Sequence, residues 1–530
     1  MKILLIYPEM PDTFYALKHF LKTIGKKASY PPLGLLTIAS LLPSDWEKKL
    51  IDTNLKPVKE EDLLWADFVF LSAMNVQEKS VNEIVNLCNT LGVKVVAGGP
   101  LFTHEFERFK GVDHFILNEA EITLPLFLKD LQNKEAKHIY QTTEFANVEL
   151  SPLPAFELVN MDDYLYAIVQ YSRGCPYMCD FCDVTALFGR RPRTKKPQQI
   201  IAELEAVRKD SKVELVLFAD DNLIGNKKAL KAELLPELIE WRKKTNPSFF
   251  FATQLTINLA DDEEMIKLMI DAGFRHIFIG LETPSEESLK ISHKTQNLKR
   301  NLLETIHYIH SKGFIISGGF IVGFDTDKQD IFKRQIDFIQ QSGIPLPIVN
   351  ILKAPPGTDL YARIKKENRL SKQFAFAEGD TNVIPIMGEY LLYKGFIEVI
   401  DNIYKPDKSY ERILTFLKSS KYPQTSIKIR RKGSISDIKI LLRVLFRLGI
   451  IGSERKYFWR LVLWSLFYNQ KMIDQVLIYS AMIHQMHETY KTIHQKASSE
   501  MNLYKPDWLE ESQISVNHDK EKRSRTGVLQ

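Results

Sequence analysis

The 530-residue sequence has few cysteines, little excess charge of either sign and no long apolar run. Four cysteines cannot form the disulfide framework of a small secreted protein. Lys and Arg number 71 against 66 Asp and Glu, and the resulting net charge of +5 does not favour a nucleic-acid partner bound through phosphates. These counts indicate a globular protein with free thiols.

The apolar stretches also argue against a membrane-spanning protein. The richest one, 457–468, contains Arg460 and is shorter than the roughly 20 apolar residues of a transmembrane helix. The first residues, MKILLIYPEM, lack the charged start and cleavage site of a signal peptide. We therefore expect a cytoplasmic protein with no transmembrane segment.

Alternation of apolar runs and helical patterns predicts a doubly wound, Rossmann-like α/β domain over residues 1–135. Ligands of such sheets bind at the carboxyl ends of the strands. Residues 136–165 contain Ser-Pro-Leu-Pro and are predicted to be a linker. The apolar runs of the first domain are 3–7, 68–73, 94–97 and 114–117.

A second alternating series predicts a partial (β/α)6 barrel over residues 166–365, whose chemistry belongs at the carboxyl ends of its strands. Residues 366–497 have long helical patterns and are predicted to be a mainly helical domain. Residues 498–530 are polar and are predicted to be a disordered tail. The strands predicted for the barrel are 168–172, 215–218, 249–252, 276–280, 315–322 and 348–352.

Three of the four cysteines, Cys175, Cys179 and Cys182, lie in the short stretch SRGCPYMCDFCD after the first predicted barrel strand. Three thiolates on one loop suit a [4Fe-4S] cluster, because each thiolate binds one iron and the fourth iron stays open for another ligand. A structural zinc ion normally takes a fourth protein ligand. No Cys or His close by in the sequence supplies one.

The spacing C-x3-C-x-aromatic-C, with Phe181 before the last cysteine, resembles the radical S-adenosylmethionine superfamily. The resemblance implies that the open iron binds S-adenosylmethionine and that reductive cleavage gives a 5′-deoxyadenosyl radical. It also implies a partial barrel of six βα units. No catalytic side chain is assigned beyond the cluster and the cofactors.

Further residues match this family one by one. Asp220 and Asp221 end the second barrel strand, where relatives bind the methionine amino group, although the common Gly-Gly-Glu is replaced here. Glu282 ends the fourth strand at the position that contacts the nucleoside in relatives. Gly323 lies in GFIVGFD, which resembles the adenine-binding segment. We predict that these residues and Phe181 surround S-adenosylmethionine.

The order of the first two domains resembles the cobalamin-binding subclass of this superfamily. The resemblance implies a cobalamin site in the loops at 30–35, 97–100 and 118–121. The histidine-bearing Asp-x-His-x-x-Gly signature is absent, which implies that cobalamin binds without a histidine from that motif. The residues predicted to bind cobalamin are Ser72, Gly98, Gly99, Pro100 and Glu119.

A basic loop follows the cysteines and has two interpretations. Its side chains either hold the carboxylate of S-adenosylmethionine or of an anionic substrate, or form a solvated surface. The fourth cysteine, Cys88, is predicted to be a small core residue. The basic residues are Arg190, Arg191, Arg193, Lys195 and Lys196.

The segments 381–385, 405–406 and 454–459 resemble the branch that includes hopanoid C-2 methylases and bacteriochlorophyll side-chain methylases. The resemblance implies a cobalamin-dependent radical methyltransferase that adds a methyl group to an unactivated carbon of a hydrophobic or natural-product-like small molecule. It also implies an electron donor such as a flavodoxin or ferredoxin. A hydrophobic substrate would allow peripheral contact with a membrane.

Two other functions stay open. A radical rearrangement or cyclisation would use the same cofactors without methyl transfer. A non-catalytic iron–sulfur or cobalamin sensor would keep the cofactors without a reaction. A methylthiotransferase is excluded, because that family uses three further cysteines for a second cluster and only Cys88 lies outside the motif.

Overall fold

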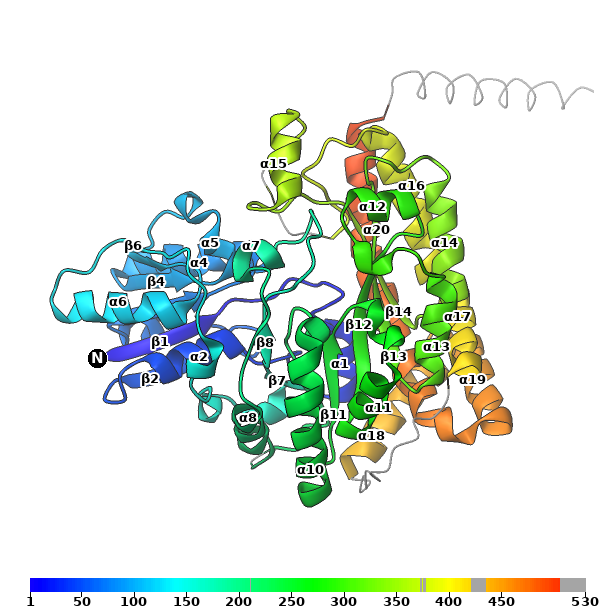
Figure 1. Ribbon diagram of the computed structural model, residues 1–530, viewed down its shortest axis with the longest axis horizontal. Coiled ribbons are helices and arrows are strands. Elements are labelled where there is room, and N and C mark those ends of the chain that lie inside the picture. The colour runs from blue at the N-terminus through cyan, green and yellow to red at the C-terminus, as the bar shows by residue number, and fades with distance from the viewer. Residues whose placement is uncertain (210, 372–373, 375–377, 421–434, 506–530) are drawn as a thin grey trace, which may run out of the picture.

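The computed structural model describes residues 1–209, 211–371, 374, 378–420 and 435–505, of which 435–437 are described by backbone alone. Two parallel sheets lie side by side, and a group of helices packs against the second (Figure 1). This confirms the predicted α/β architecture with a helical C-terminal part. No helix within the described ranges combines the length and the apolar character needed to cross a bilayer.

The first sheet has six parallel strands in the order β2-β1-β3-β4-β5-β6. Successive residues of a strand point to opposite faces, so Ile3 and Leu5 pack beneath α2 and α6, whereas Leu4 and Ile6 pack beneath α4. Helices therefore cover both faces, as predicted. The elements are β1 (Lys2–Tyr7), α2 (Leu33–Leu41), β2 (Glu47–Asp52), α3 (Glu60–Leu64), β3 (Phe68–Ser72), α4 (Glu78–Leu91), β4 (Lys94–Gly98), α5 (Pro100–Thr103), β5 (His114–Ile116), α6 (Ala120–Gln132) and β6 (Ile139–Tyr140).

Two strands of this sheet differ from the prediction. β2 lies at the sheet edge, and four of the six residues of its sequence, EKKLID, are charged, so it has no apolar run. β6 is two residues long and lies in the predicted linker, which extends the first sheet beyond residue 135.

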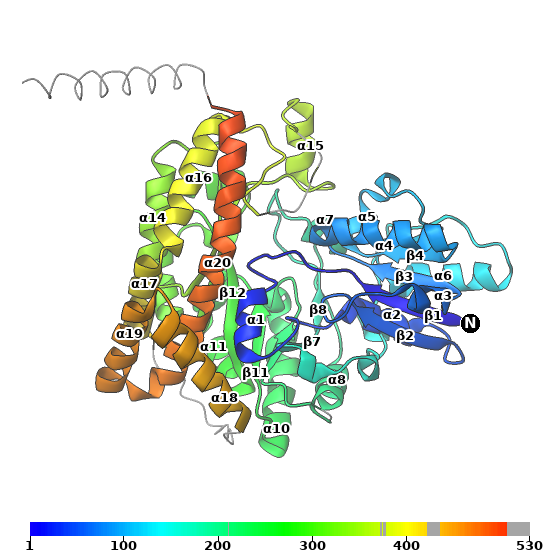
Figure 2. The same cartoon turned by 180° about the vertical axis from the view of Figure 1, so that it is seen from behind.

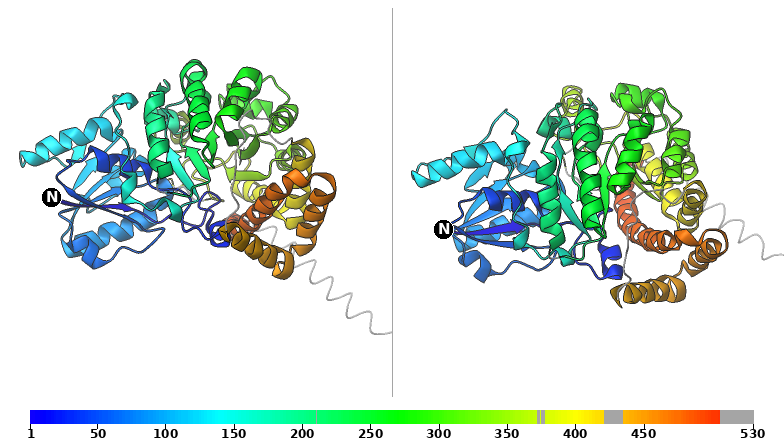
Figure 3. Two further views of the ribbon diagram at one scale, coloured as in Figure 1. Left: turned by 90° about the horizontal axis from the view of Figure 1, so that it is seen from below. Right: turned by 60° about the horizontal axis from the view of Figure 1, so that its bottom comes forward.

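The second sheet is also parallel, with the order β14-β13-β12-β11-β10-β7, and its helices surround it to form a partial barrel (Figure 3). All six strands fall at the predicted places. The elements are β7 (Tyr166–Val169), β8 (Ser172–Arg173), α7 (Val184–Phe188), β9 (Arg193–Thr194), α8 (Pro197–Lys209), β10 (Leu215–Phe218), α9 (Lys227–Ala229), α10 (Leu235–Thr245), β11 (Phe250–Gln254), α11 (Glu263–Ala272), β12 (Phe274–Glu282), α12 (Glu286–Ile291), α13 (Leu302–Ser311), β13 (Ile315–Val322), α14 (Ile331–Ser342), β14 (Leu346–Ile351) and α15 (Asp359–Lys366).

Some of the C-terminal helices pack at the amino end of this barrel. Their core includes Tyr166, Ile315 and Leu346, which begin strands β7, β13 and β14. Helix α1 (Lys18–Ile24), from the N-terminal part of the chain, joins the same core and lies beside α20 (Figure 2). The other helices are α16 (Glu389–Tyr404), α17 (Pro406–Ser419), α18 (Ile435–Val444), η10 (Leu445–Ile451), α19 (Arg455–Tyr468) and α20 (Ile473–Leu503).

The predicted disordered tail needs one correction. α20 continues to Leu503, because Ile493 and Ala497 are buried against α16 and hold the last turns of the helix in place. Residues 506–530 of the predicted tail lie outside the described residues.

Candidate cofactor site

A short antiparallel pair, β8 with β9, forms the base of the cysteine loop directly after β7. Gly174 has a φ of 92°, and a Cβ there would lie 3.0 Å from the carbonyl oxygens of Phe188 and Gly189. Only glycine therefore allows the two ends of the loop to approach so closely. The Cys175 N–H donates to the Gly189 oxygen, and the Cys182 N–H donates to the Cys179 oxygen.

The three loop cysteines are partly exposed free thiols. Amide groups face two of them, with Asn222 Nδ2 3.9 Å from Cys175 Sγ and Gln296 Nε2 3.7 Å from Cys179 Sγ. Among the described residues, the buried oxygens Asn222 Oδ1 and Gln296 Oε1 find no hydrogen-bond partner. Donors aimed at sulfur are what thiolate ligands of a cluster accept.

The arrangement fits a cluster. Burial raises the pKa of all three thiols, and iron would offset this because metal ligation favours the thiolate. Across the described ranges, no three His, Cys, Asp or Glu side chains are placed to share one metal ion. A four-iron cluster needs no such convergence, because each thiolate binds its own iron atom.

A buried ion pair lies beside the cysteine loop. Glu282 ends β12 with a φ of 63°, and its Oε1 lies 2.6 Å from Lys294 Nζ. Burial lowers the pKa of Lys294, but the charges of Glu282 and Cys179 and the hydrogen bond raise it above its usual value. Lys294 Nζ also lies 5.9 Å from the centre of the Phe181 ring. Sequence reasoning missed Lys294, since a lone lysine 12 residues from its partner gives no signal.

Asp220 and Asp221 hold the backbone that leads into the loop. Asp220 is completely buried and accepts hydrogen bonds from the N–H groups of Tyr171 (3.2 Å) and Ser172 (2.5 Å). Asp221 accepts one from the N–H of Gly174 at 2.9 Å. Burial raises the pKa of Asp220 to about 7 and that of Asp221 to about 6. These contacts were not predicted, and binding of the methionine group by either residue stays a prediction.

The predicted adenine segment lies next to the same loop. Gly323 has a φ of 99°, and its N–H donates to Asp327 Oδ2 at 2.9 Å. The Phe324 ring centre is 6.0 Å from that of Phe181. The structure therefore brings Phe181, Glu282 and Gly323 to one end of the barrel, although they are widely separated in sequence.

A cavity of about 370 Å³ lies between the two sheets. Tyr7, Ser72, Gly98 and Ile116, which end β1, β3, β4 and β5, form one side of it. The barrel contributes the other side. This side includes Ile168 of β7, Gln170 directly after β7, and Leu187 and Phe188 of α7. All five residues predicted to bind cobalamin, Ser72, Gly98, Gly99, Pro100 and Glu119, line this cavity.

The cavity wall has the features of a site for a large, flat ligand. A Cβ at Gly34 would meet only Ser72 Oγ within 4 Å, so the backbone there is open to the cavity. A Cβ at Gly99 would lie 2.8 Å from the same oxygen, and one at Gly98 would lie 2.6 Å from the oxygen of Ile116. Among the described residues that line the cavity, none is a histidine.

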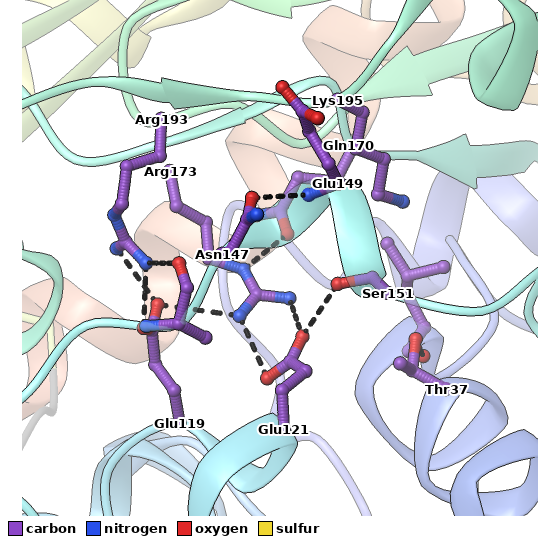
Figure 4. Close-up of polar contacts among 12 residues, drawn as sticks. Thr37, Glu119, Glu121, Asn147, Glu149, Ser151, Gln170, Arg173, Arg193 and Lys195 are labelled. Carbon is purple, nitrogen blue, oxygen red and sulfur yellow. Dashed lines mark hydrogen bonds and ion pairs between the residues drawn. The ribbon is translucent and has the colours of Figure 1, made fainter.

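Two partly buried arginines join the domains at the edge of the cavity (Figure 4). Arg173 of β8 pairs with Glu121 at 2.6 Å, and Arg193 of β9 pairs with Glu119 at 2.7 Å. Arg173 also reaches Glu119 at 3.4 Å. Glu119 thus lines the cavity while its carboxylate is occupied by arginines. We call these four residues the interdomain clamp.

For two residues of the basic loop, Arg193 and Lys195, the structure corrects both interpretations. Arg193 belongs to the clamp, and Lys195 is buried with its Nζ 2.5 Å from Glu203 Oε1. Neither is free to bind a carboxylate ligand, and neither is solvated. Arg190, Arg191 and Lys196 are exposed.

Comparison with known proteins gives two family matches. Residues 169–339 match the radical SAM superfamily, and residues 358–499 match a domain of unknown function, DUF4070. An uncharacterized methyltransferase of Synechocystis sp. is 35% identical over 97% of both chains. The hopanoid C-2 methylase of Rhodopseudomonas palustris is 32% identical, over 92% of this chain and 93% of that protein.

A solved structure has a similar fold. The cobalamin-dependent S-adenosylmethionine radical enzyme OxsB superposes with a TM-score of 0.59 at 14% identity, over 95% of this chain and 84% of that one. A cysteine loop at the strand ends of a parallel barrel, beside a doubly wound sheet, defines a radical S-adenosylmethionine enzyme. The chain belongs to the radical S-adenosylmethionine family that includes the hopanoid C-2 methylase. Its membership confirms the predicted class, a radical methyltransferase.

Proposed function

We propose that the enzyme uses cobalamin and S-adenosylmethionine to add a methyl group to an unactivated carbon of a hydrophobic or natural-product-like small molecule. The cavity between the two sheets carries this proposal. It lies at the carboxyl ends of the first sheet, where doubly wound sheets bind ligands. Its other wall includes α7, which follows the cysteine loop directly.

The proposed sites use residues already described. Cys175, Cys179 and Cys182 would hold the cluster, and Phe181, Glu282 and Gly323 would surround S-adenosylmethionine. The cavity would hold cobalamin, and because no histidine lines its described part, the cobalt would have no histidine ligand from this wall. When bound, these cofactors supply a radical that removes a substrate hydrogen and a carrier for the methyl group.

The chain's own residues position the cofactors and exclude water. Asp220 and Asp221 fix the entry to the cysteine loop through its backbone. The interdomain clamp keeps the two walls of the cavity together. Exclusion of water from such a site would protect a reactive radical from side reactions.

The proposed substrate class rests on a relative of this chain. The hopanoid C-2 methylase acts, by its name, on a hopanoid. We therefore favour a large hydrophobic substrate for this chain.

We propose a small acidic electron carrier, such as a flavodoxin or ferredoxin, as the electron donor. Arg190 and Arg191 are exposed in the stretch that closes the cysteine loop and would attract an acidic partner. Free thiols at the site fit the cytoplasm, because that compartment keeps thiols reduced.

Anaerobic reconstitution with iron, sulfide and hydroxocobalamin tests the proposal. Bound corrin, 5′-deoxyadenosine and S-adenosylhomocysteine are measured after addition of a strong reductant and S-adenosylmethionine, with Cys179→Ala as control. We expect the unmodified protein to give bound corrin, 5′-deoxyadenosine and S-adenosylhomocysteine. The Cys179→Ala variant should form neither 5′-deoxyadenosine nor S-adenosylhomocysteine. A product without an added methyl group would favour a rearrangement or cyclisation, and bound cofactors without turnover would favour a sensor. Cleavage without bound corrin would refute the cobalamin proposal.

A further inference from the structure

The hairpin of α18, η10 and α19 carries apolar side chains on its outer surface. Ile438, Leu442, Phe446 and Ile450 are exposed and follow one another at intervals of four residues, so they lie on one side of the helix. On the other side, Val444 and Leu448 are buried in the helical core. The helix therefore has two apolar sides, and the described residues cover only one of them.

α19 repeats this pattern. Trp459, Leu463 and Phe467 are exposed at intervals of four residues, and the side chain of Phe467 is 80% exposed. Phe458 and Leu461 on the opposite side are buried. A soluble helix usually has polar residues on its outer side, so this exposure calls for a partner.

The two exposed sides meet at the turn between the helices. Trp459 Nε1 donates to the oxygen of Gly449 at 2.9 Å, so the start of α19 lies against the end of η10. Ile450 and Ile451, next to Gly449, are both exposed. We call these exposed apolar side chains of α18, η10 and α19, from Ile438 to Phe467, the hairpin face.

The hairpin face lies in the most basic part of the chain. Residues 421–471 contain 12 Lys or Arg and two Asp or Glu, whereas the whole chain has a net charge of only +5. The rest of the chain is therefore net negative. One of the two acids, Glu454, is buried, whereas Arg455, Lys456 and Arg460 beside the apolar side chains are exposed.

We propose that the hairpin face binds the surface of an anionic lipid bilayer. An apolar helical face with Trp and Phe, flanked by Lys and Arg, is the pattern of helices that lie in the membrane interface. A second copy of this chain fits less well, because self-association would bring two basic surfaces together. The inference does not depend on the reaction proposed above.

The position of the hairpin face predicts what membrane binding would change. The core beneath it packs on the starts of β7, β13 and β14, whereas the cysteine loop follows the carboxyl end of β7. The face and the cofactor cavity thus lie toward opposite ends of the barrel. Binding would hold the enzyme at a membrane without covering the cavity.

Co-sedimentation of the full-length protein with vesicles tests the proposal. One set of vesicles is phosphatidylcholine alone, and the other contains about 30% phosphatidylglycerol. We expect about tenfold stronger partition to the anionic set, and weaker binding at high salt. The variant Leu442→Glu/Phe467→Glu should lose about tenfold of this binding, because two acids replace exposed apolar groups.

Leu150→Glu is the matched control, since Leu150 is 78% exposed and lies outside the hairpin face. It should bind vesicles as the unmodified protein does. Thermal unfolding and 5′-deoxyadenosine formation should be unchanged in both variants, which separates lost binding from misfolding. Equal binding by the double variant would overturn the proposal. A second outcome would also overturn it: light scattering shows that the unmodified protein is a dimer and the double variant a monomer, and neither protein binds vesicles.

Discussion

Arg173 and Glu121 form a two-point ion pair between the domains, with Nη2 2.6 Å from Oε1 and Nη1 3.1 Å from Oε2. Burial by itself would raise the pKa of Glu121, but the charge and hydrogen bonds of Arg173 lower it to about 2. The pair therefore stays charged at neutral pH. It ties the first turn of α6 to β8 at the edge of the cavity between the two sheets (Figure 4).

Replacement of Arg173 by methionine should destabilise the protein by about 3 kcal/mol, because Glu121 would stay buried without its partner. Urea unfolding at pH 7 measures this. Arg208→Met is the control, since its pair with Glu205 is exposed and should contribute about 1 kcal/mol or less. Equal effects of the two substitutions would argue against a structural clamp. Arg173→Met should also weaken corrin binding, because Arg173 lines the cavity.

Loss of one loop cysteine should remove the cluster. Cys179→Ala should leave little bound iron and sulfide after anaerobic reconstitution, and no 5′-deoxyadenosine should form. Cys88→Ala is the matched control, because Cys88 is a buried thiol of α4 outside the loop. The Cys88→Ala variant should keep the cluster and lose only the packing contacts of the buried thiol. Comparable iron content in both variants would contradict the prediction that Cys179 binds the cluster.

The cavity can be filled from Gly34, which lies in the first turn of α2 and is exposed to the cavity. Gly34→Phe should lower hydroxocobalamin affinity at least about tenfold, because its ring would occupy the space proposed for the corrin. Gly34→Ala adds only a methyl group and should keep binding while stabilising the helix by about 0.5–1 kcal/mol. Visible absorbance of bound corrin and thermal unfolding measure the two effects. Unimpaired binding by Gly34→Phe would place the corrin elsewhere.

Glu282→Gln keeps the side-chain shape but removes the charge that pairs with buried Lys294. We expect cluster content to be kept and 5′-deoxyadenosine formation to fall about tenfold or more, because the lysine loses its charge partner beside the cluster. Glu287→Gln, an exposed position on α12, should have no effect. A loss of iron in Glu282→Gln would show that the residue supports the loop instead of S-adenosylmethionine.

Glu378 should make stability depend on pH. Burial raises its pKa to about 7, while the N–H of Phe14 donates to its carboxylate at 3.1 Å. Since the folded pKa exceeds the unfolded one, the contribution of Glu378 is present at low pH and is lost as pH rises toward 7. The glutamine of a Glu378→Gln variant does not titrate. The free energy of unfolding of this variant, relative to that of the unmodified protein, should therefore rise by about 2 kcal/mol between pH 5 and 8.

Urea unfolding at the two pH values measures this difference. Glu398→Gln is the control, because Glu398 is exposed on α16 and should show no such change. A stability difference that is the same at both pH values would contradict the raised pKa of Glu378.

Local sequence patterns determined much of this protein. The cysteine spacing predicted three thiols on one short loop, and the structure places them together after β7. The six strands of the barrel could be predicted because buried parallel strands are apolar runs. β2 could not be predicted, since an edge strand needs no apolar run and four of the six residues of this one are charged.

Only the tertiary structure decided which distant residues meet. Arg173 and Glu121 are 52 residues apart, and Lys294 pairs with Glu282 although the whole of α12 lies between them in the sequence. Helix α1 belongs by sequence to the first domain, yet it packs with α20 at the far end of the barrel. Ion pairs and packing between elements depend on how the whole chain folds, and a local pattern carries no information about the partner.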